Sequence, residues 1–200
     1  MKKIPTLFVR DYNNDGKVVN ELTPGTEWVR DGEGLATRKW DGLAILIQGR
    51  NVYKRYDAKA FTIDKKTGER RVYDRKPPEG FIPLQEFDPI TGHLPGWIPC
   101  SLPDDKLVIG IYNANPDNFP DGTYELCGPK IGTRGGPNPE KLNENGLYKH
   151  GCTEYPDFPR SFDEIANELR DKDIEGIVWH HPDGRMVKVK AKDFGIIRPS

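Results

Sequence analysis

Glycine and proline interrupt this chain at short intervals and limit the length that a helix or strand can reach. The 200 residues include 21 glycines and 18 prolines. Glycine loses the most backbone entropy on folding, and proline lacks the amide proton that helices and strand ladders use. We therefore expect short strands joined by long connections, with few helices.

Short apolar runs between these breaks predict the strands. Residues 43–56 read as a β-hairpin, and residues 174–180 and 185–189 read as a second one. Residues 107–112 have the apolar character of a buried strand, and residues 123–126, which follow a turn at Asp121-Gly122, read as another strand.

One helix and one insertion complete the expected architecture. Ser161 and Glu164 have capping-box spacing and predict a helix that ends near Arg170. Residues 57–100 are polar and predict a loop-rich insertion. The sum is an α+β chain dominated by antiparallel strands, organised as a single domain over residues 1–200.

Composition narrows the functional classes. The formal net charge is −1, so a polyanion site must be a local cluster of lysines and arginines. The three cysteines form no C-x-x-C pair, and the four histidines show no ligand spacing, which argues against a disulfide framework and a zinc site. We expect a cytoplasmic protein without a signal peptide or membrane span.

The first candidate for chemistry is Lys39-Trp40-Asp41-Gly42, directly before an apolar run. A lysine there is expected at a turn that leads into the sheet. Lysine becomes a nucleophile when cationic neighbours or a metal lower the pKa of its amine, so that the amine loses its proton. A solvated lysine beside an ordinary Asp-Gly turn would give the same pattern, so this motif alone is weak.

Two carboxylates follow in strand-like surroundings. Glu125 lies among apolar residues, where an unpartnered carboxylate is costly. Glu175 precedes Gly176 and an apolar run, as if another group must approach that backbone closely. Each glutamate alone also suits a solvated strand face or an incidental turn.

The last candidate is Met186-Val187-Lys188-Val189-Lys190. Strict alternation places both lysines on one face of a strand and both valines on the other. Two like charges on one face favour a bound anion such as phosphate, although a solvated edge strand would have the same pattern.

These four patterns occur in the order of the motifs K-x-D-G, strand glutamate, E-G-hydrophobic and K-x-K. In that order they resemble the covalent nucleotidyltransferase superfamily of ATP-dependent DNA ligases, RNA ligases and mRNA capping enzymes. The resemblance spans about residues 36–190. It implies an antiparallel-sheet-rich, ATP-grasp-like adenylation domain, here expected without an OB-fold.

Further segments resemble one branch of this superfamily. Glu125-Leu126-Cys127-Gly128-Pro129-Lys130 is similar to small RNA ligases that join 5′-phosphate to 3′-hydroxyl ends. Pro95-Gly96-Trp97-Ile98-Pro99 and His150-Gly151 share that similarity. The resemblance therefore implies an ATP-dependent RNA ligase that forms a lysyl-AMP intermediate, with Mg²⁺ or Mn²⁺ as its metal.

The resemblance also implies roles around the nucleotide. Lys39 would attack the α-phosphate of ATP, while Asp41 and Gly42 would shape the turn. Backbone atoms of Thr37 and Arg38 would contact the adenine.

The remaining roles concern the ribose, the phosphates and the metal. Glu125 would hold the ribose or a hydrated metal, and Glu175 would hold metal near the α-phosphate. Lys188 and Lys190 would bind that phosphate and favour the neutral Lys39 amine by charge repulsion. Arg55 would bind ribose or the incoming 5′-phosphate.

An aromatic ring is also expected to stack on the adenine. Tyr148 is the first candidate for this role, with Tyr155 and Phe158 as rivals.

Two departures from the family pattern bear on these roles. Many relatives carry Arg or Asn shortly after K-x-D-G, where this chain has Leu43, Ala44 and Ile45. The interval between Lys39 and Glu125 is also long, which is why an insertion is expected.

Alternatives remain at this point. A DNA ligase core or an mRNA guanylyltransferase would share the motifs, and a degenerate nucleotide- or RNA-binding module would keep the fold without turnover. RNA ends are the expected partners of a monomer, and Arg134, Lys149, Lys54 and Arg55 or a partner protein are expected to recruit them.

Overall fold

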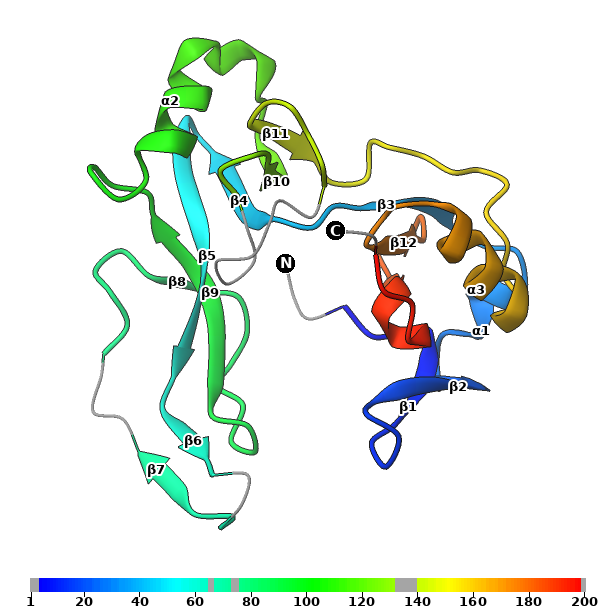
Figure 1. Ribbon diagram of the computed structural model, residues 1–200. Helices are drawn as coiled ribbons and strands as arrows, with labels where there is room; N and C mark the ends of the chain where they lie inside the picture. Colours follow the sequence, from blue (N-terminus) through cyan, green and yellow to red (C-terminus); the bar gives the residue numbers. More distant parts are fainter. Residues whose placement is uncertain (1–3, 65–66, 73–75, 132–139, 199–200) are drawn as a thin grey trace. The chain divides into compact units, whose positions relative to one another are not determined.

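The computed structural model describes residues 4–64, 67–72, 76–131 and 140–198. These residues form two compact units. Residues 43–124 make up the first unit, coloured cyan to green in Figure 1, and residues 4–42 and 125–198 make up the second. The expectation of a single domain over residues 1–200 stays a prediction.

The first unit is built on an antiparallel sheet. Its strands are β4 (Leu43–Gln48), β5 (Asn51–Lys59), β9 (His93–Pro99) and β8 (Ile82–Pro83), adjacent in that order. The predicted hairpin over residues 43–56 is therefore confirmed as β4 and β5.

A small two-stranded sheet extends the first unit. It pairs β6 (Phe61–Ile63) with β7 (Arg70–Val72), whose residues are all exposed. In the predicted insertion, residues 57–100, the described hydrophobic residues that are buried are Phe61 and Trp97. This segment thus contributes little to a core, as its polar composition indicated.

The prediction of a strand over residues 107–112 was wrong. The segment forms helix α2 (Lys106–Ala114), which the short 3-10 helix η1 (Pro116–Asn118) follows. Val108 and Tyr112 are its buried residues, and they are four positions apart. This spacing places them on one helical face, so an apolar run that suggested burial on both sides of a strand instead covers one side of a helix.

Strand β10 (Gly122–Cys127) begins in the first unit and ends in the second, where β11 (Gly146–Lys149) lies beside it. The predicted strand over residues 123–126 is confirmed. The central sheet of the second unit has the order β13 (Met186–Lys190), β12 (Gly176–His180), β3 (Leu35–Lys39). Strands β12 and β13 confirm the second predicted hairpin, and all pairings in this sheet are antiparallel.

Helix α3 (Phe162–Asp171) packs on the core of the second unit through Ile165, Ala166 and Leu169. Its extent confirms the predicted helix. The capping box differs in detail, because the Ser161 hydroxyl lies 2.5 Å from the Glu164 carboxylate and no side chain caps the helix backbone.

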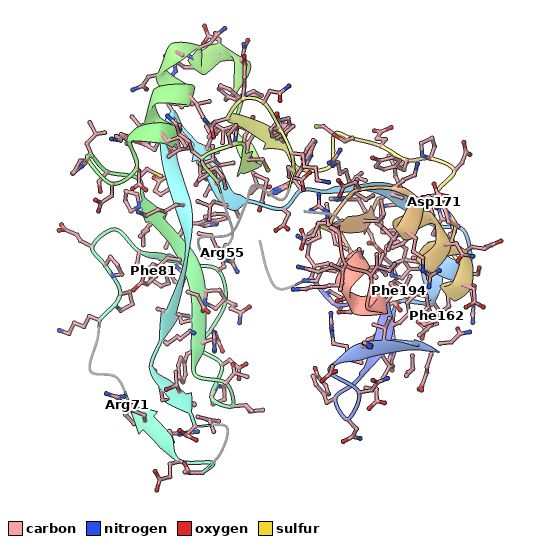
Figure 2. The ribbon with its side chains drawn as sticks, in the orientation of Figure 1. Arg55, Arg71, Phe81, Phe162, Asp171 and Phe194 are labelled. Atoms are coloured by element: carbon pink, nitrogen blue, oxygen red, sulfur yellow. The ribbon has the colours of Figure 1, made fainter. Side chains whose placement is uncertain are left out.

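Shorter elements close the core of the second unit. They are β1 (Phe8–Asp11), β2 (Lys17–Leu22), α1 (Glu27–Arg30) and η3 (Ala191–Phe194). Phe162 and Phe194 lie side by side in Figure 2, with ring centroids 5.1 Å apart, and Phe8 packs edge-on against Phe162 at 4.9 Å.

The fold class is mixed, as predicted. The described residues form mostly antiparallel strands with three α-helices. None of the helices in these residues combines the length and apolar content needed to span a bilayer.

Candidate active site

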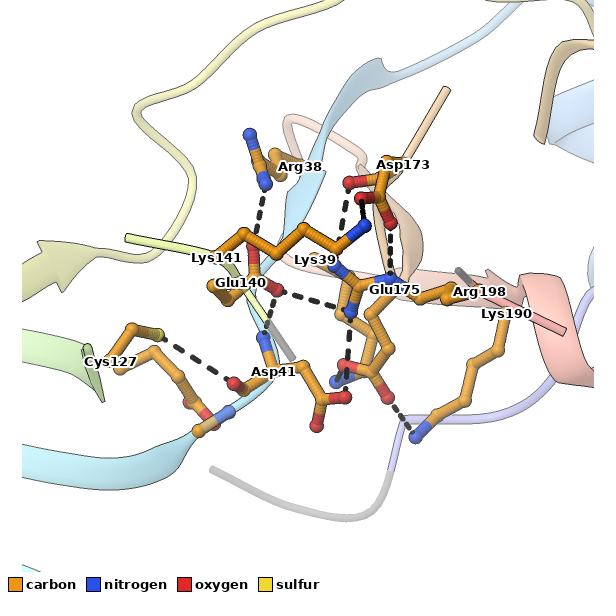
Figure 3. A network of polar contacts seen from close by, with 12 residues as sticks. Arg38, Lys39, Asp41, Cys127, Glu140, Lys141, Asp173, Glu175, Lys190 and Arg198 are labelled. Atoms are coloured by element: carbon orange, nitrogen blue, oxygen red, sulfur yellow. Dashed lines mark hydrogen bonds and ion pairs between the residues drawn. The ribbon is translucent and has the colours of Figure 1, made fainter. Parts of the chain in front are cut away.

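Glu175 joins the first and last of the predicted motifs within the second unit. In the central sheet, Gly176 pairs with Lys39 on one side and with Lys190 on the other. Glu175 therefore lies between the two lysines, and its two carboxylate oxygens are each 2.5 Å from a lysine Nζ (Figure 3). Lys39 is the last residue of strand β3, so the expectation that it lies in a turn was wrong.

Gly176 permits this close arrangement. A Cβ atom at this position would lie 2.0 Å from the backbone oxygen of Val189. The predicted close approach at the E-G motif is therefore confirmed, and the approaching group is the neighbouring strand β13.

The charges around Lys39 keep its amine protonated. Burial alone would lower its pKa, but the adjacent Glu175 carboxylate and, more weakly, Glu125 and Asp41 outweigh burial, so the pKa is raised. The effect of Lys188 and Lys190 on the Lys39 amine stays a prediction, because the Glu175 carboxylate raises the pKa of Lys39 in this arrangement. Burial likewise raises the pKa of Glu175, and the two lysines bonded to it lower it by more.

Lys188 has the opposite electrostatics. Burial, followed by the positive charges of Lys190 and Lys39, lowers its pKa to about 8. Along β13 the valines are buried and the lysines half-buried, which confirms the predicted alternation. The Lys188 amide donates to the carbonyl of Pro5 (3.0 Å), which ties this strand to the N-terminal segment.

The turn after Lys39 is held from β10. The Gly42 amide donates to Oε1 of Glu125 (3.1 Å), and Oε2 of Glu125 lies 2.9 Å from Nε2 of His150. A Cβ on Gly42 would lie 2.2 Å from the backbone oxygen of Leu126. Glu125 thus supports the turn of the K-x-D-G motif, a role that the sequence assigned to Asp41 and Gly42 alone.

Sequence reasoning missed a buried acid beside this turn. The side chain of Glu140 is 0% exposed, and its Oε1 accepts the Asp41 amide (2.9 Å). Its Oε2 lies 2.5 Å from the guanidinium of Arg38. Glu140 is 99 positions from Asp41, and no spacing pattern in the sequence indicates this contact.

Arg198 extends the same network (Figure 3). Its guanidinium lies 3.5 Å from Glu140, 3.6 Å from Asp41 and 3.1 Å from Asp173. Lys141 also contacts Asp173, at 2.9 Å. The pKa of Asp41 is raised, first by burial and then by the charge of Glu175, while Lys39 and Arg198 oppose the rise.

The three aromatic candidates for adenine stacking differ in how deeply their rings are buried. Tyr148 stacks on Trp40 with ring centroids 4.2 Å apart, and the Arg38 guanidinium lies over the Trp40 ring at 3.9 Å. Phe158 is buried in the core against Trp179, which leaves no open ring face there. Tyr155 packs against that core. Tyr148 therefore stays the first candidate for adenine stacking.

The backbone around Thr37 and Arg38 is already bonded. The Arg38 amide donates to the carbonyl of Thr153 (2.8 Å), and the Thr37 hydroxyl donates to that of Val178 (3.1 Å). A contact between this segment and adenine stays a prediction, and it would need atoms other than these donors.

The remaining predicted cations divide between the units. Arg55 lies on β5 of the first unit, 5.5 Å from the Trp97 ring centroid, and burial lowers its pKa. Lys54 forms an ion pair with Asp105 at 2.8 Å. Lys149 ends β11 in the second unit, and Arg134 lies outside the described residues. The role of each in RNA recruitment stays a prediction.

The donor set is compatible with a magnesium ion, within limits. Mg²⁺ prefers carboxylate oxygens and usually combines one or two of them with substrate phosphates. Glu125 and Glu175 supply such oxygens, although both oxygens of Glu175 contact lysines. The described residues contain no group of three His, Cys, Asp or Glu side chains that would hold a metal by themselves. A metal here would therefore depend on phosphate ligands.

This arrangement can bind a phosphate and form a bond to it. Lys188 and Lys190 offer two ammonium groups. Lys39 offers an amine that is paired with the Glu175 carboxylate. Lysine in such a setting acts as a covalent nucleophile once it is neutral.

Comparisons with known proteins bear on this chemistry. No protein-family model matches the chain. The chain is 28% identical to RNA ligase 1 of Mus musculus over 165 residues, which cover 63% of this chain and 50% of the relative. RNA ligase 1 of Rattus norvegicus is 28% identical and that of Pongo abelii 27% identical, with 63% of this chain and 51% of each relative covered.

The chain spans about half the length of the curated relatives it matches. It is a distant homologue of RNA ligase 1, and the predicted resemblance to the covalent nucleotidyltransferase superfamily is confirmed at that distance.

Proposed function

We propose that this chain is an ATP-dependent RNA ligase that carries AMP on Lys39. The observation that carries the proposal is the pairing of Glu175 with both Lys39 and Lys190, because it unites three of the four motifs in one buried cluster. The distant homology to RNA ligase 1 supports RNA as the polynucleotide.

In the first step, the Lys39 amine attacks the α-phosphate of ATP. A nitrogen–phosphorus bond forms, the bond to the bridging oxygen breaks, and pyrophosphate leaves. The amine must first lose the proton that Glu175 stabilises, and this proton passes to solvent before the attack. Burial and the charges of Lys188 and Lys190 favour the neutral amine whenever Glu175 turns away from Lys39.

The cations of β13 have a second task in this step. Lys188 and Lys190 lie on the half-buried face of the strand, opposite the buried valines, and supply positive charge for the α-phosphate. Mg²⁺, when bound near Glu125 and Glu175, would neutralise further phosphate charge and stabilise the leaving oxygen.

Two further steps complete the reaction. The 5′-phosphate of one RNA end attacks the lysyl-AMP, which releases Lys39 and leaves AMP linked to the RNA through a pyrophosphate bond. The 3′-hydroxyl of the other end then attacks that linkage, forms the phosphodiester and releases AMP. Lys39 is needed as a nucleophile in the first step alone.

A joining assay tests this order of events. The wild-type protein is expected to join a 5′-phosphorylated RNA to a 3′-hydroxyl RNA when ATP is present. Lys39→Ala should fail on that substrate but still join RNA that already carries a 5′-adenylyl group. The matched control is Lys192→Ala, an exposed lysine on η3, which should behave as wild type.

Two results would contradict the proposal. If Lys39→Ala joined the 5′-phosphorylated RNA, Lys39 would not be the nucleophile of the first step. Failure of the wild-type protein on both RNA substrates would favour a binding module. A cytoplasmic location, a monomeric state and a partner protein for RNA recruitment remain part of the proposal.

A further inference from the structure

Positive charge gathers in one stretch of the first unit. Residues 54–76 contain nine lysines and arginines but four aspartates and glutamates, a net of +5 in a chain whose net charge is −1. A local surplus of this kind is the electrostatic signature of a polyanion-binding surface.

Two of these cations are already bonded within the unit. Lys54 pairs with Asp105, and the Arg70 guanidinium lies 3.8 Å from the Phe61 ring centroid and donates to the carbonyl of Pro89. These two basic residues have structural roles that account for their positions.

Three other cations have no such role. Lys59, Arg71 and Lys76 are exposed, and none of them forms an ion pair with a carboxylate in the part of the chain that the structure describes. Each one is therefore available for a phosphate group. Figure 2 shows Arg71 on β7, in the small sheet at the end of this unit.

A cavity lies between two of these cations. It has a volume of about 300 Å³ and is lined by residues that include Tyr56, Lys59, Thr62 and Lys76. This volume lies at the lower end of the range of small-molecule sites and suits a single nucleotide. The ring of Tyr56, braced edge-on by Phe81 at 6.0 Å, offers an aromatic surface to it.

Strand pairing brings the third cation to the same face. Arg71 lies directly opposite Thr62 in the pairing of β6 with β7. Residues directly opposite each other in an antiparallel pair project to the same side of the sheet. Arg71 and the cavity lining at Thr62 therefore share one face.

We propose that the face formed by Tyr56, Lys59, Arg71 and Lys76 binds single-stranded RNA. The three cations contact successive phosphates, and one base enters the cavity and stacks on Tyr56. The inference rests on the proposed function, since it assigns the RNA-recruiting surface of the same enzyme. An acidic protein partner would use the cations but has no need of an aromatic-lined cavity.

Binding of a fluorescent single-stranded RNA, followed by anisotropy, tests the surface. The variant Lys59→Ser/Arg71→Ser/Lys76→Ser is expected to bind RNA roughly 10- to 100-fold more weakly at low salt, because each lost phosphate contact removes counterion release. The slope of log K against log salt should fall in magnitude by about 2, at about 0.7 per contact.

The matched control removes the same charge elsewhere. Arg50, Lys106 and Lys192 are exposed cations outside this face, and their combined replacement by serine should change RNA affinity less than threefold, roughly the loss expected from long-range charge alone. Tyr56→Phe should bind as wild type, whereas Tyr56→Ala should bind about tenfold more weakly, since stacking is worth about 1–3 kcal/mol per base.

Lysyl-AMP formation separates the two proposals. It requires no RNA, so the triple serine variant should form lysyl-AMP at the wild-type rate, which also shows that it folds. Unchanged RNA affinity in that variant, or an equal loss in the control triple, would overturn the RNA-binding face. A wild-type protein that binds RNA through these residues but forms no lysyl-AMP would contradict the proposed function and leave the face intact.

Discussion

Lys188 and Lys39 lie on strands β13 and β3, on either side of β12 in the central sheet of the second unit, but their pKa values are shifted in opposite directions. The pKa of Lys188 is lowered to about 8 by burial and by two ammonium neighbours, whereas Glu175 raises that of Lys39. Lys188 is therefore mostly protonated below pH 8 and loses its charge as the pH rises through that value.

This titration predicts the pH dependence of ATP binding. Affinity should fall as the pH rises through about 8, because Lys188 then no longer offers a charge to phosphate. Lys188→Arg should keep its affinity up to about pH 10, since a guanidinium stays protonated. The measurement is the Kd of a non-reacting ATP analogue across this range, and an equal fall in both proteins would contradict the assignment.

Glu140 predicts a second effect at the residue scale. Glu140→Ala should leave the Arg38 guanidinium and the Asp41 amide without their carboxylate partner, at a cost of about 3–5 kcal/mol in the free energy of unfolding. It should also slow lysyl-AMP formation, because the turn after Lys39 loses its support.

The conservative variant and a control make this prediction specific. Glu140→Gln keeps an acceptor for the Asp41 amide and should retain more activity than Glu140→Ala. Glu168→Ala removes an exposed pair with Lys172 and should cost at most about 0.5 kcal/mol. Chemical denaturation gives the stabilities, and equal losses in Glu140→Ala and Glu168→Ala would be evidence against the buried network.

At this scale the sequence identified residues that share a short motif but not their long-range partners. Glu175 and Lys190 could be predicted because local spacing relates each to a strand. Glu140 and Arg198 could not, since each reaches the turn after Lys39 from a segment without regular structure. Such contacts depend on how loops close, which no periodicity encodes.

At the scale of the element, two glycines differ in why they matter: Gly176 is required by close strand packing, whereas Gly110 only lowers helix propensity. Gly176 lies within van der Waals distance of the neighbouring strand backbone, whereas a Cβ on Gly110 in α2 would meet nothing within 4 Å. Glycine inside a helix lowers stability by roughly 0.5–1 kcal/mol relative to alanine. The same substitution should therefore have opposite signs at the two positions.

Thermal unfolding measures both changes. Gly176→Ala should lower the Tm by roughly 5–15 °C, because the new Cβ would force β12 and β13 apart, at about 2–4 kcal/mol. Gly110→Ala should raise the Tm by about 1–4 °C. An unchanged Tm for Gly176→Ala would mean that the two strands are less closely packed than described.

Helix α2 shows where element prediction failed. The run of residues 107–112 is too short to show a full helical period, so apolar content alone favoured a strand. Val108 and Tyr112, four positions apart and buried together, were the helical signal. The two hairpins were predicted correctly because in each one the turn residues and the alternation of apolar and polar residues indicate the same structure.

At the scale of the whole molecule, charge is divided unevenly along the chain. Residues 54–76 carry a net of +5, which leaves −6 on the other residues. Salt should therefore weaken RNA binding steeply but change lysyl-AMP formation little, because the Lys39 cluster is largely buried and less screened. Rates of both reactions between about 0.05 and 0.5 M salt test this, and an equal dependence would contradict separate surfaces.

The most direct test of the account is covalent transfer of label from ATP. The protein, with Mg²⁺ and ATP or GTP labelled at the α-phosphate, is denatured, digested and analysed for the modified peptide. We predict label from ATP on the peptide that contains Lys39, and none in Lys39→Ala. Label on another residue, label from GTP alone, or no label from freshly de-adenylylated protein would contradict the assignment of Lys39 as the AMP-carrying nucleophile of an ATP-dependent ligase.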